Sequence, residues 1–187
     1  YGLPENTEEK YPFECSGGMT RRILLSTALM GNPKLIIADE PTPGMDLELA
    51  KKSMKDFRKF ADEGNGVLLI THDIELALHV ADRIVVFYAG KTVEEAPVSD
   101  FDSEETLRHP YTKALWRALP QNGFVPLAGV QPYVKDMPEG CPFGPRCGWY
   151  QEHCREEIPM VQAGCGSVRC VRYCTGEKNK FQEEAKS

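Results

Sequence analysis

The sequence lacks several features that would place it in common functional classes. No apolar run approaches the roughly 20 residues that a membrane-spanning helix needs, so any membrane role is expected to depend on a partner. Positive charge is scarce: 22 Lys and Arg stand against 28 Asp and Glu, and the net charge of −6 argues against a nucleic-acid partner. The chain begins with Tyr1 and has no leader in which basic residues precede an apolar run. A fragment, a processed chain or an expression product would look the same.

Cysteine is nearly absent from the first 140 residues, which contain only Cys15. The other six cysteines lie between Cys141 and Cys174. A secreted fold held together by disulfides usually spreads its cysteines along the chain. A local group of this kind therefore favours a metal or cluster site over a disulfide framework.

The remaining composition, 41% hydrophobic and 27% charged, is typical of a folded globular chain. Hydrophobic periodicity predicts helices over 16–30, 46–61, 74–81 and 110–119, strands over 35–38 and 67–70, and a hairpin over 84–93. Because short apolar strands alternate with helices, we expect an α/β fold with a mostly parallel sheet, at least up to residue 82. A loop-rich stretch of Pro and Gly follows residue 120, so we place a domain boundary between 1–121 and 122–187.

The first candidate site is a glycine-rich helix start formed by Ser16, Gly17, Gly18 and Met19. Two glycines allow the backbone to approach a phosphate closely, and a helix N-terminus offers free N–H groups and a favourable dipole. The Ser16 hydroxyl can add one hydrogen bond. An ordinary N-cap would have the same composition, so this segment alone does not decide between the two interpretations.

Acidic residues and a histidine follow the two predicted strands. Asp39 and Glu40 end the first strand, at the sheet edge where ligands bind in open α/β sheets, although such acids also serve as helix caps. The first acid can hold Mg²⁺ and the second can orient an attacking water. His72 comes two residues after the second strand, at the same edge, and can contact a γ-phosphate or be purely structural. Asp46 ends a stiff turn after the acids and is also a plausible N-cap.

In this order and spacing, the segments resemble the motifs of ATP-binding-cassette (ABC) ATPases. Residues 16–22 resemble the signature motif, and residues 35–40 resemble the Walker B strand with its catalytic glutamate. Residues 43–46 fall at the D-loop and His72 at the switch histidine. In this family two ATPase subunits sandwich two ATP molecules, and the signature of one subunit faces the phosphate loop of the other.

The resemblance implies a role for each matched residue. Asp39 would serve Mg²⁺, Glu40 the hydrolytic water and His72 the γ-phosphate. The signature and the D-loop would also contact nucleotide. The signature, which serves the partner's ATP, contributes Ser16, Gly17, Gly18 and Met19, and the D-loop contributes Asp46.

The chain departs from the family pattern at several points. Arg21 stands where the family usually has Gln, and the D-loop has Pro-Gly-Met-Asp in place of a small residue followed by Ala-Leu-Asp. No G-x-x-x-x-G-K-[ST] phosphate-binding loop (Walker A) occurs in the 187 residues, and no glutamine loop is recognisable. The chain alone is therefore expected to bind ATP poorly.

The tail resembles that of oligopeptide and dipeptide importer ATPases and their nickel-importing relatives. Tyr11-Pro12, the His-Pro-Tyr-Thr segment at 109–112 and the C-x-F-x-P-R-C pattern at 141–147 carry this resemblance, which covers residues 11–172. The family pattern implies four cysteine ligands: Cys141, Cys147, Cys154 and Cys170. The segment around Cys165 lacks the histidine expected there.

Four thiolates on a loop-rich segment can ligate an iron–sulfur cluster or a tetrahedral zinc ion. The family resemblance favours [4Fe–4S], and the unequal spacings do not match paired C-x-x-C zinc knuckles. Buried, reduced thiols with structural roles are the remaining alternative. Cys165 and Cys174 are spare thiols that could substitute as ligands.

The resemblance implies an ATP-hydrolysing subunit that powers import of oligopeptides, dipeptides or nickel through a membrane permease. Its expected partners are a second ABC ATPase subunit, the permease and, indirectly, an extracytoplasmic solute-binding protein, and its expected location is the cytoplasmic face of the membrane. Three alternatives remain open: a non-catalytic subunit that donates its signature motif, an iron–sulfur redox or interaction module, and an ABC ATPase acting on DNA or ribosomes. The acidic charge and the cysteine tail weigh against the last.

Overall fold

The computed structural model describes residues 3–174, which form two compact units joined between Ala81 and Asp82. The boundary that the sequence suggests at residue 121 falls inside the second unit and remains a prediction. No helix in the described part of the chain is long and apolar enough to cross a membrane.

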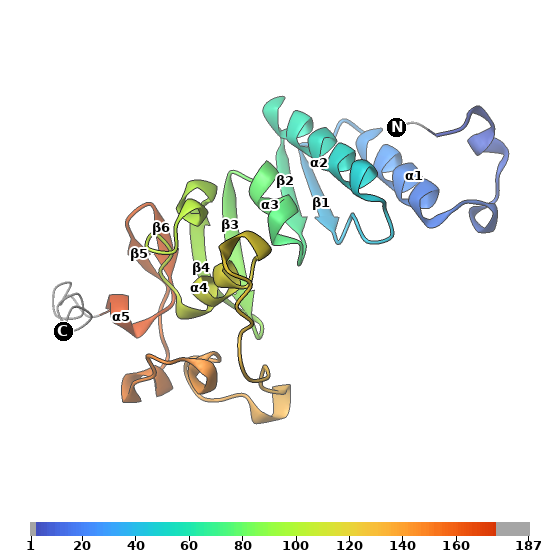
Figure 1. Cartoon of the computed structure of the whole chain (residues 1–187). Coiled ribbons are helices and arrows are strands. Elements are labelled where there is room, and N and C mark those ends of the chain that lie inside the picture. The colour runs from blue at the N-terminus through green and yellow to red at the C-terminus, as the bar shows by residue number, and fades with distance from the viewer. Residues whose placement is uncertain (1–2, 175–187) are drawn as a thin grey trace. The chain divides into compact units, whose positions relative to one another are not determined.

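The first unit alternates helices and strands, as predicted (Figure 1). Strands β1 and β2 pair in parallel, with Leu35 opposite Gly66 and Asp39 opposite Ile70. The parallel arrangement expected up to residue 82 is therefore confirmed. The elements are α1 (Gly17–Leu29), β1 (Leu35–Asp39), α2 (Leu47–Asp62), β2 (Gly66–Ile70) and α3 (Ile74–Val80), preceded by 3₁₀ turns at Glu5–Glu9 and Pro12–Glu14.

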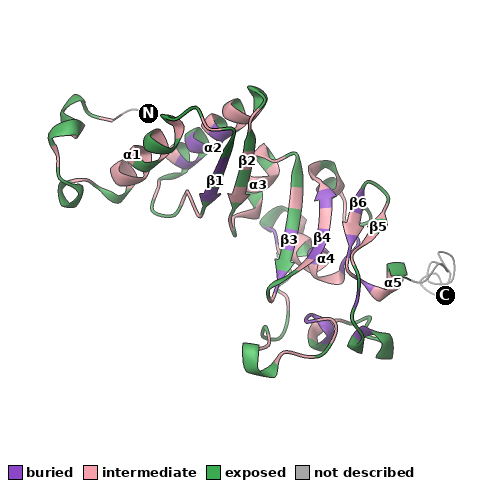
Figure 2. Ribbon diagram, turned by 180° about the vertical axis from the view of Figure 1, so that it is seen from behind, coloured by how far each residue is buried: buried purple, intermediate pink, exposed green. Residues whose placement is uncertain are grey.

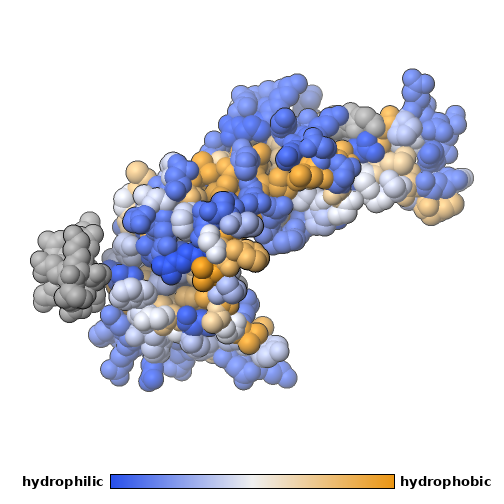
Figure 3. Space-filling model, viewed as in Figure 1, coloured by the Kyte–Doolittle hydropathy of each residue, from blue (hydrophilic) through white to orange (hydrophobic). Residues whose placement is uncertain are grey.

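A small core holds the first unit together on one face of its sheet. Ile36 and Ala38 alternate along β1 and are buried against Met54 and Phe57 of α2. Val67 and Leu69 of β2 pack against the same core. Alternate residues of a strand point to opposite faces, so the apolar side chains between them lie on the other face. These exposed side chains are Leu35, Ile37, Leu68 and Ile70. Apolar side chains also reach the surface near α1 and α2 (Figure 3).

The second unit is built on an antiparallel sheet with the strand order β3-β4-β6-β5. The predicted hairpin is present as β3 and β4, of which β4 is the more buried (Figure 2). The sequence did not predict the short hairpin of β5 and β6, which adds to the sheet through β4. The elements are β3 (Arg83–Tyr88), β4 (Lys91–Pro97), α4 (Pro110–Arg117), β5 (Val161–Ala163), β6 (Gly166–Val168) and α5 (Val171–Cys174). Short 3₁₀ turns lie at Val98–Asp102, Pro120–Asn122, Val134–Asp136, Gly144–Arg146 and Glu152–Arg155.

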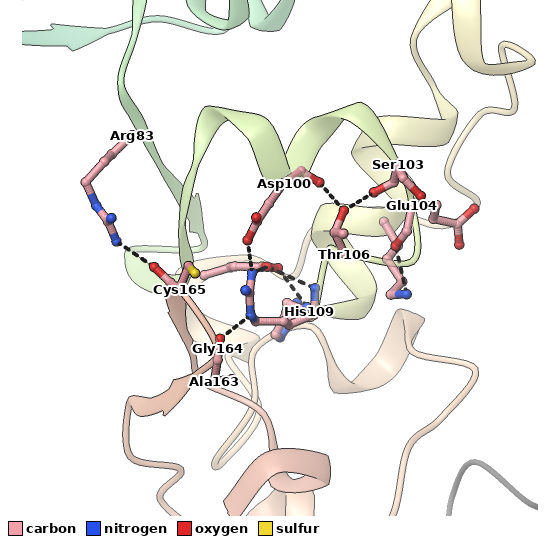
Figure 4. A network of polar contacts seen from close by, with 12 residues as sticks. Arg83, Asp100, Ser103, Glu104, Thr106, His109, Ala163, Gly164 and Cys165 are labelled. Carbon is pink, nitrogen blue, oxygen red and sulfur yellow. Dashed lines mark hydrogen bonds and ion pairs between the residues drawn. The ribbon is translucent and has the colours of Figure 1, made fainter.

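A buried polar network joins these strands to the segment before α4. The Glu94 carboxylate is fully buried and accepts hydrogen bonds from the Arg108 and His109 backbone N–H groups at 2.9 and 2.7 Å. The Arg108 guanidinium also contacts Glu94 and Asp100, at 3.3 and 2.7 Å, and donates to the Ala163 carbonyl at 2.6 Å. Figure 4 shows Asp100, His109 and Ala163 gathered around this network. The β5–β6 hairpin is thereby tied to the rest of the second unit.

Candidate functional site

The predicted glycine-rich helix start is present at the N-terminus of α1. Ser16 is the N-cap, and its hydroxyl oxygen accepts a hydrogen bond from the Met19 N–H at 3.3 Å. A Cβ atom added to Gly17 would meet no atom within 4 Å, and Ser16 and Gly17 are exposed. Gly18 is half-buried beside Leu49. The capping interpretation is thus satisfied, and the helix N-terminus is also open to a ligand.

Glu40 and His72, the two residues predicted to act in catalysis, lie in direct contact. Oε1 of Glu40 is 2.8 Å from the His72 ring Nδ1 and accepts a hydrogen bond from the His72 backbone N–H at 3.1 Å. The Glu40 N–H continues the β1–β2 ladder by donating to the Ile70 carbonyl at 2.9 Å. The parallel pairing therefore places the ends of both strands together, as the sequence predicts.

The contact polarises both side chains of this pair. The hydrogen bond to Glu40, followed by the carboxylate charge, raises the pKa of His72 above its ordinary value. The imidazole remains 82% exposed, so it is accessible to a ligand. The second carboxylate oxygen of Glu40, Oε2, is buried and has no hydrogen-bond partner within residues 3–174.

Arg21 is a contributor that the sequence did not predict as part of the site. Its Nη1 donates to the backbone carbonyl of Glu40 at 3.0 Å. The backbone of Glu40 has a φ of +42°, in the left-handed region that residues with a Cβ rarely adopt. One signal in the sequence indicated this role: position 21 is Arg, where the family resemblance leads one to expect Gln.

A cavity of about 410 Å³ lies beside this part of the first unit. Its wall is mostly apolar, and its polar groups come from Arg21, Ser53 and the two acids at the end of β1. The lining is completed by Leu24, Leu25, Ala28, Ile36, Ile37, Ala38, Pro41, Met45 and Phe57. The acids thus border an open space rather than a packed core.

The two remaining predicted acids differ in their surroundings. Asp39 is exposed at the end of β1. Carboxylate oxygens are ligands that a hard cation such as Mg²⁺ prefers. Asp46 caps α2 by accepting a hydrogen bond from the Leu49 N–H at 2.9 Å. It follows a turn in which Gly44 adopts a φ of +77°. Asp46 therefore has a demonstrated structural role, and its nucleotide role remains a prediction.

The start of the signature segment does not contact the Glu40–His72 pair directly. In the described part of the chain, no hydrogen bond or ion pair joins the segment Ser16–Gly18 to Asp39, Glu40 or His72. The contact with Glu40 comes from Arg21, further along the same motif.

Two known families match this chain. The family described as "Oligopeptide/dipeptide transporter, C-terminal region" matches residues 93–154, and the family described as "ABC transporter" matches residues 2–43. The dipeptide transport ATP-binding protein DppD of Haemophilus influenzae is 38% identical over 89% of this chain and 52% of its own length. This chain belongs to the peptide-importer ABC ATPases.

Other known proteins are also similar to this peptide-importer ATPase chain. DppD of Escherichia coli is 37% identical over 86% of this chain and 51% of its own length. A solved dimeric ATP-binding cassette in a post-hydrolysis state, bound to ADP and Pi, aligns at 32% identity with a TM-score of 0.49. That alignment covers 51% of this chain and 41% of the other. The chain spans about half the length of the curated relatives it matches.

The cysteines of this ABC ATPase chain are all free thiols. Burial raises the pKa of the Cys141 and Cys147 thiols and raises that of Cys170 to about 12. The backbone N–H group two residues later acts against this rise in pKa at each of the three thiols, and the Cys154 sulfur accepts a hydrogen bond from the Gln151 N–H at 3.5 Å. Such N–H groups stabilise a thiolate, whether free or bound to a metal.

The four predicted cysteine ligands lie in the same part of the second unit, since the charges of Cys141 and Cys147 act on Cys170. However, within residues 3–174 no group of three or more His, Cys, Asp or Glu side chains has an arrangement that would hold a metal ion. The donor chemistry suits a cluster or zinc, and the thiols would have to move together to bind either one.

Proposed function

We propose that this chain is part of the ATP-hydrolysing subunit of a peptide ABC importer. The observation that carries the proposal is the Glu40–His72 contact at the carboxyl ends of β1 and β2, beside an exposed Asp39. An acid, a second acid and an imidazole at one sheet edge are the groups that phosphoryl transfer to water requires.

Glu40 positions the attacking water in this proposal. One carboxylate oxygen, Oε1, is engaged by His72, and the other, Oε2, is buried without a partner among the described residues, so the side chain would turn to bring an oxygen to the water. As the water oxygen attacks the γ-phosphorus, the bond to the ADP oxygen breaks and the water proton moves toward the carboxylate.

His72 stabilises the charge that develops on the γ-phosphate. Its Nδ1 faces Glu40, which leaves Nε2 to donate to a phosphate oxygen. The raised pKa of His72 increases the share of the cationic form, and a cation binds phosphate more strongly than a neutral ring does. Asp39 would hold Mg²⁺, which neutralises charge on the β- and γ-phosphates when it is bound.

The open N-terminus of α1 serves a different ATP molecule. Backbone N–H groups following Ser16, together with the helix dipole, form an anion site that faces the nucleotide of a second ATPase subunit. Met19 and Asp46 border the shared nucleotides in this arrangement. The Walker A loop that the 187 residues lack comes from outside this sequence.

The relatives' names indicate the substrate and the partners. DppD is named a dipeptide transport ATP-binding protein, so we propose that ATP hydrolysis drives uptake of dipeptides or oligopeptides, with nickel as the less favoured solute. The subunit would bind a membrane permease at the cytoplasmic face, and an extracytoplasmic solute-binding protein would deliver the solute.

We also propose that Cys141, Cys147, Cys154 and Cys170 bind a [4Fe–4S] cluster, with zinc as the alternative. The backbone N–H groups that lower the pKa of Cys141, Cys147 and Cys170, and the bond from the Gln151 N–H to Cys154, support this assignment. Iron and sulfide analysis of the protein purified without oxygen tests it. About four irons and four sulfides per chain are expected, whereas a colourless protein that contains zinc would overturn the cluster.

The ATPase proposal is tested by hydrolysis in an assembly of this chain with a second ABC subunit, with a Walker A region joined to this chain so that the ATP sites of both subunits are complete. The wild-type chain is expected to increase ATP turnover by the assembly, and Gly17→Asp, which places a carboxylate at the open helix N-terminus, is expected to abolish the increase. Equal turnover with and without the chain would contradict the proposal. Turnover that requires Gly17 but not Glu40 would favour the non-catalytic signature donor.

A further inference from the structure

Arg21 links the signature helix to the proposed catalytic glutamate. It lies in the second turn of α1, whose N-terminus carries the signature segment, and its guanidinium is partly buried against the end of β1. The bond from Arg21 Nη1 to the Glu40 carbonyl is 3.0 Å long and is charge-assisted on the donor side. The two residues are adjacent in space although 19 positions apart in sequence.

The Glu40 backbone needs support, because its φ of +42° is disfavoured for a residue with a Cβ. Three of its contacts come from the β2 side: the N–H donates to the Ile70 carbonyl, and Oε1 accepts from the ring and the backbone of His72. Arg21 supplies the hydrogen bond from the α1 side. The conformation is therefore fixed between two elements, of which α1 contributes through Arg21.

From this geometry we infer that Arg21 is a positioning residue, which holds the Glu40 backbone so that the carboxylate faces His72 and couples the position of α1 to that carboxylate. The catalytic consequence of this coupling rests on the proposed function, whereas the coupling itself does not. A shift of the signature helix would move the guanidinium that anchors Glu40. One subunit's contact with its partner's ATP would then alter the geometry at its own glutamate.

Hydrogen exchange at the His72 backbone amide tests the coupling in the chain itself. This amide donates to Glu40 Oε1, so its protection reports where the carboxylate lies. Arg21→Met retains the packing of the side-chain stem beside the cavity but removes the donor, and exchange at His72 is expected to rise about tenfold. Arg21→Lys retains a donor and a charge and should restore most of the protection.

Two controls separate positioning from general destabilisation. Lys52→Met removes one exposed cation from α2, for which the structure gives no contact with Glu40, and should leave His72 exchange unchanged. The amides of Leu68 and Leu69 in β2 should keep wild-type rates in every variant. Unchanged His72 exchange in Arg21→Met would overturn the inference, as would an equal rise throughout β2, because the effect would then be on stability alone.

Turnover in the same assembly, with a Walker A region joined to this chain so that ATP binds beside Glu40, gives an independent measurement. Arg21→Met is expected to lower kcat about tenfold with an unchanged KM for ATP, because the substrate still binds while Glu40 is misplaced. A rise in KM with normal kcat would contradict positioning. If the wild-type assembly hydrolyses no ATP, the proposed function fails, and the exchange experiment still decides whether Arg21 positions Glu40.

Discussion

The two units of this chain each bring a glutamate together with an arginine and a histidine, but in opposite settings. In the first unit, Glu40 is 38% exposed, its neighbour His72 is freely accessible, and one carboxylate oxygen has no partner within the described residues. In the second unit, Glu94 is fully buried and both of its oxygens accept hydrogen bonds from the segment that contains Arg108 and His109. The first group reaches the surface through the His72 ring and holds one buried carboxylate oxygen without a partner in the described residues, whereas the second group is enclosed and stabilises the fold.

The largest expected difference between the two glutamates is in stability. Glu94→Gln leaves the buried Arg108 charge with only Asp100 to balance it and is expected to lower the free energy of unfolding by about 3 kcal/mol. Glu40→Gln removes an exposed charge and should change it by less than about 0.5 kcal/mol. Urea unfolding measures both variants. Circular dichroism follows the helices and strands of both units, and tryptophan fluorescence follows the second unit, which contains Trp116 and Trp149. Equal effects would remove the distinction.

The two histidines are expected to respond to pH with opposite signs. Burial lowers the pKa of His109 to about 4, so the unfolded chain takes up a proton at higher pH than the folded one does. Stability is therefore lost as the pH falls from about 6.5 toward 4, by roughly 3 kcal/mol in total. His109→Asn retains an N-cap acceptor for the Tyr111 N–H and should flatten this dependence. An unchanged pH profile of unfolding in the variant would show that another group is responsible.

A smaller contrast concerns one glycine from each unit. A Cβ at Gly166 would lie 2.3 Å from the Glu95 carbonyl oxygen, inside the packed contact between β4 and β6. Gly166→Ala is therefore expected to destabilise the second unit by about 2 kcal/mol. Gly17→Ala meets open space and should be neutral within about 0.5 kcal/mol. Thermal unfolding measures both, and an equal loss at Gly17 would show that the N-terminus of α1 is packed.

The smallest expected effect is a change in the His72 titration without a change in fold. Glu40→Gln removes the charged hydrogen-bond acceptor, so the pKa of His72 should fall to its ordinary range. Because the wild-type pKa is raised, any stability that this pair contributes is present below the ordinary pKa and is lost as the pH rises through the folded one. Titration of the imidazole by NMR gives the result, and an unchanged pKa would mean that the contact is not maintained in solution.

The elements of the first unit could be predicted because local signals agreed with the fold. Asp46 caps a helix, and apolar runs at 35–38 and 67–70 form the two strands. The contact between Glu40 and His72 followed from parallel pairing, which aligns the ends of the two strands. Strand order and strand direction were sufficient for that inference.

Other contacts could not be predicted, since no local pattern encodes them. The role of Arg21 depends on where a long side chain ends, and the backbone strain at Glu40 has no sequence signature in a residue that is not glycine. The β5–β6 hairpin has only three residues in each strand, and its sequence does not alternate long enough to predict a strand. Its position depends on Arg108, a residue more than 50 positions away.

The most direct measurement is the fate of ATP bound beside Glu40 when a Walker A region is joined to this chain in the assembly and Glu40 is replaced. After a single turnover, Glu40→Gln should retain ATP that has not been hydrolysed, whereas the wild type should contain ADP, because the amide can still contact His72 but cannot accept the proton of the attacking water. Hydrolysis by Glu40→Gln at the wild-type rate would contradict a catalytic role for the acid at the end of β1.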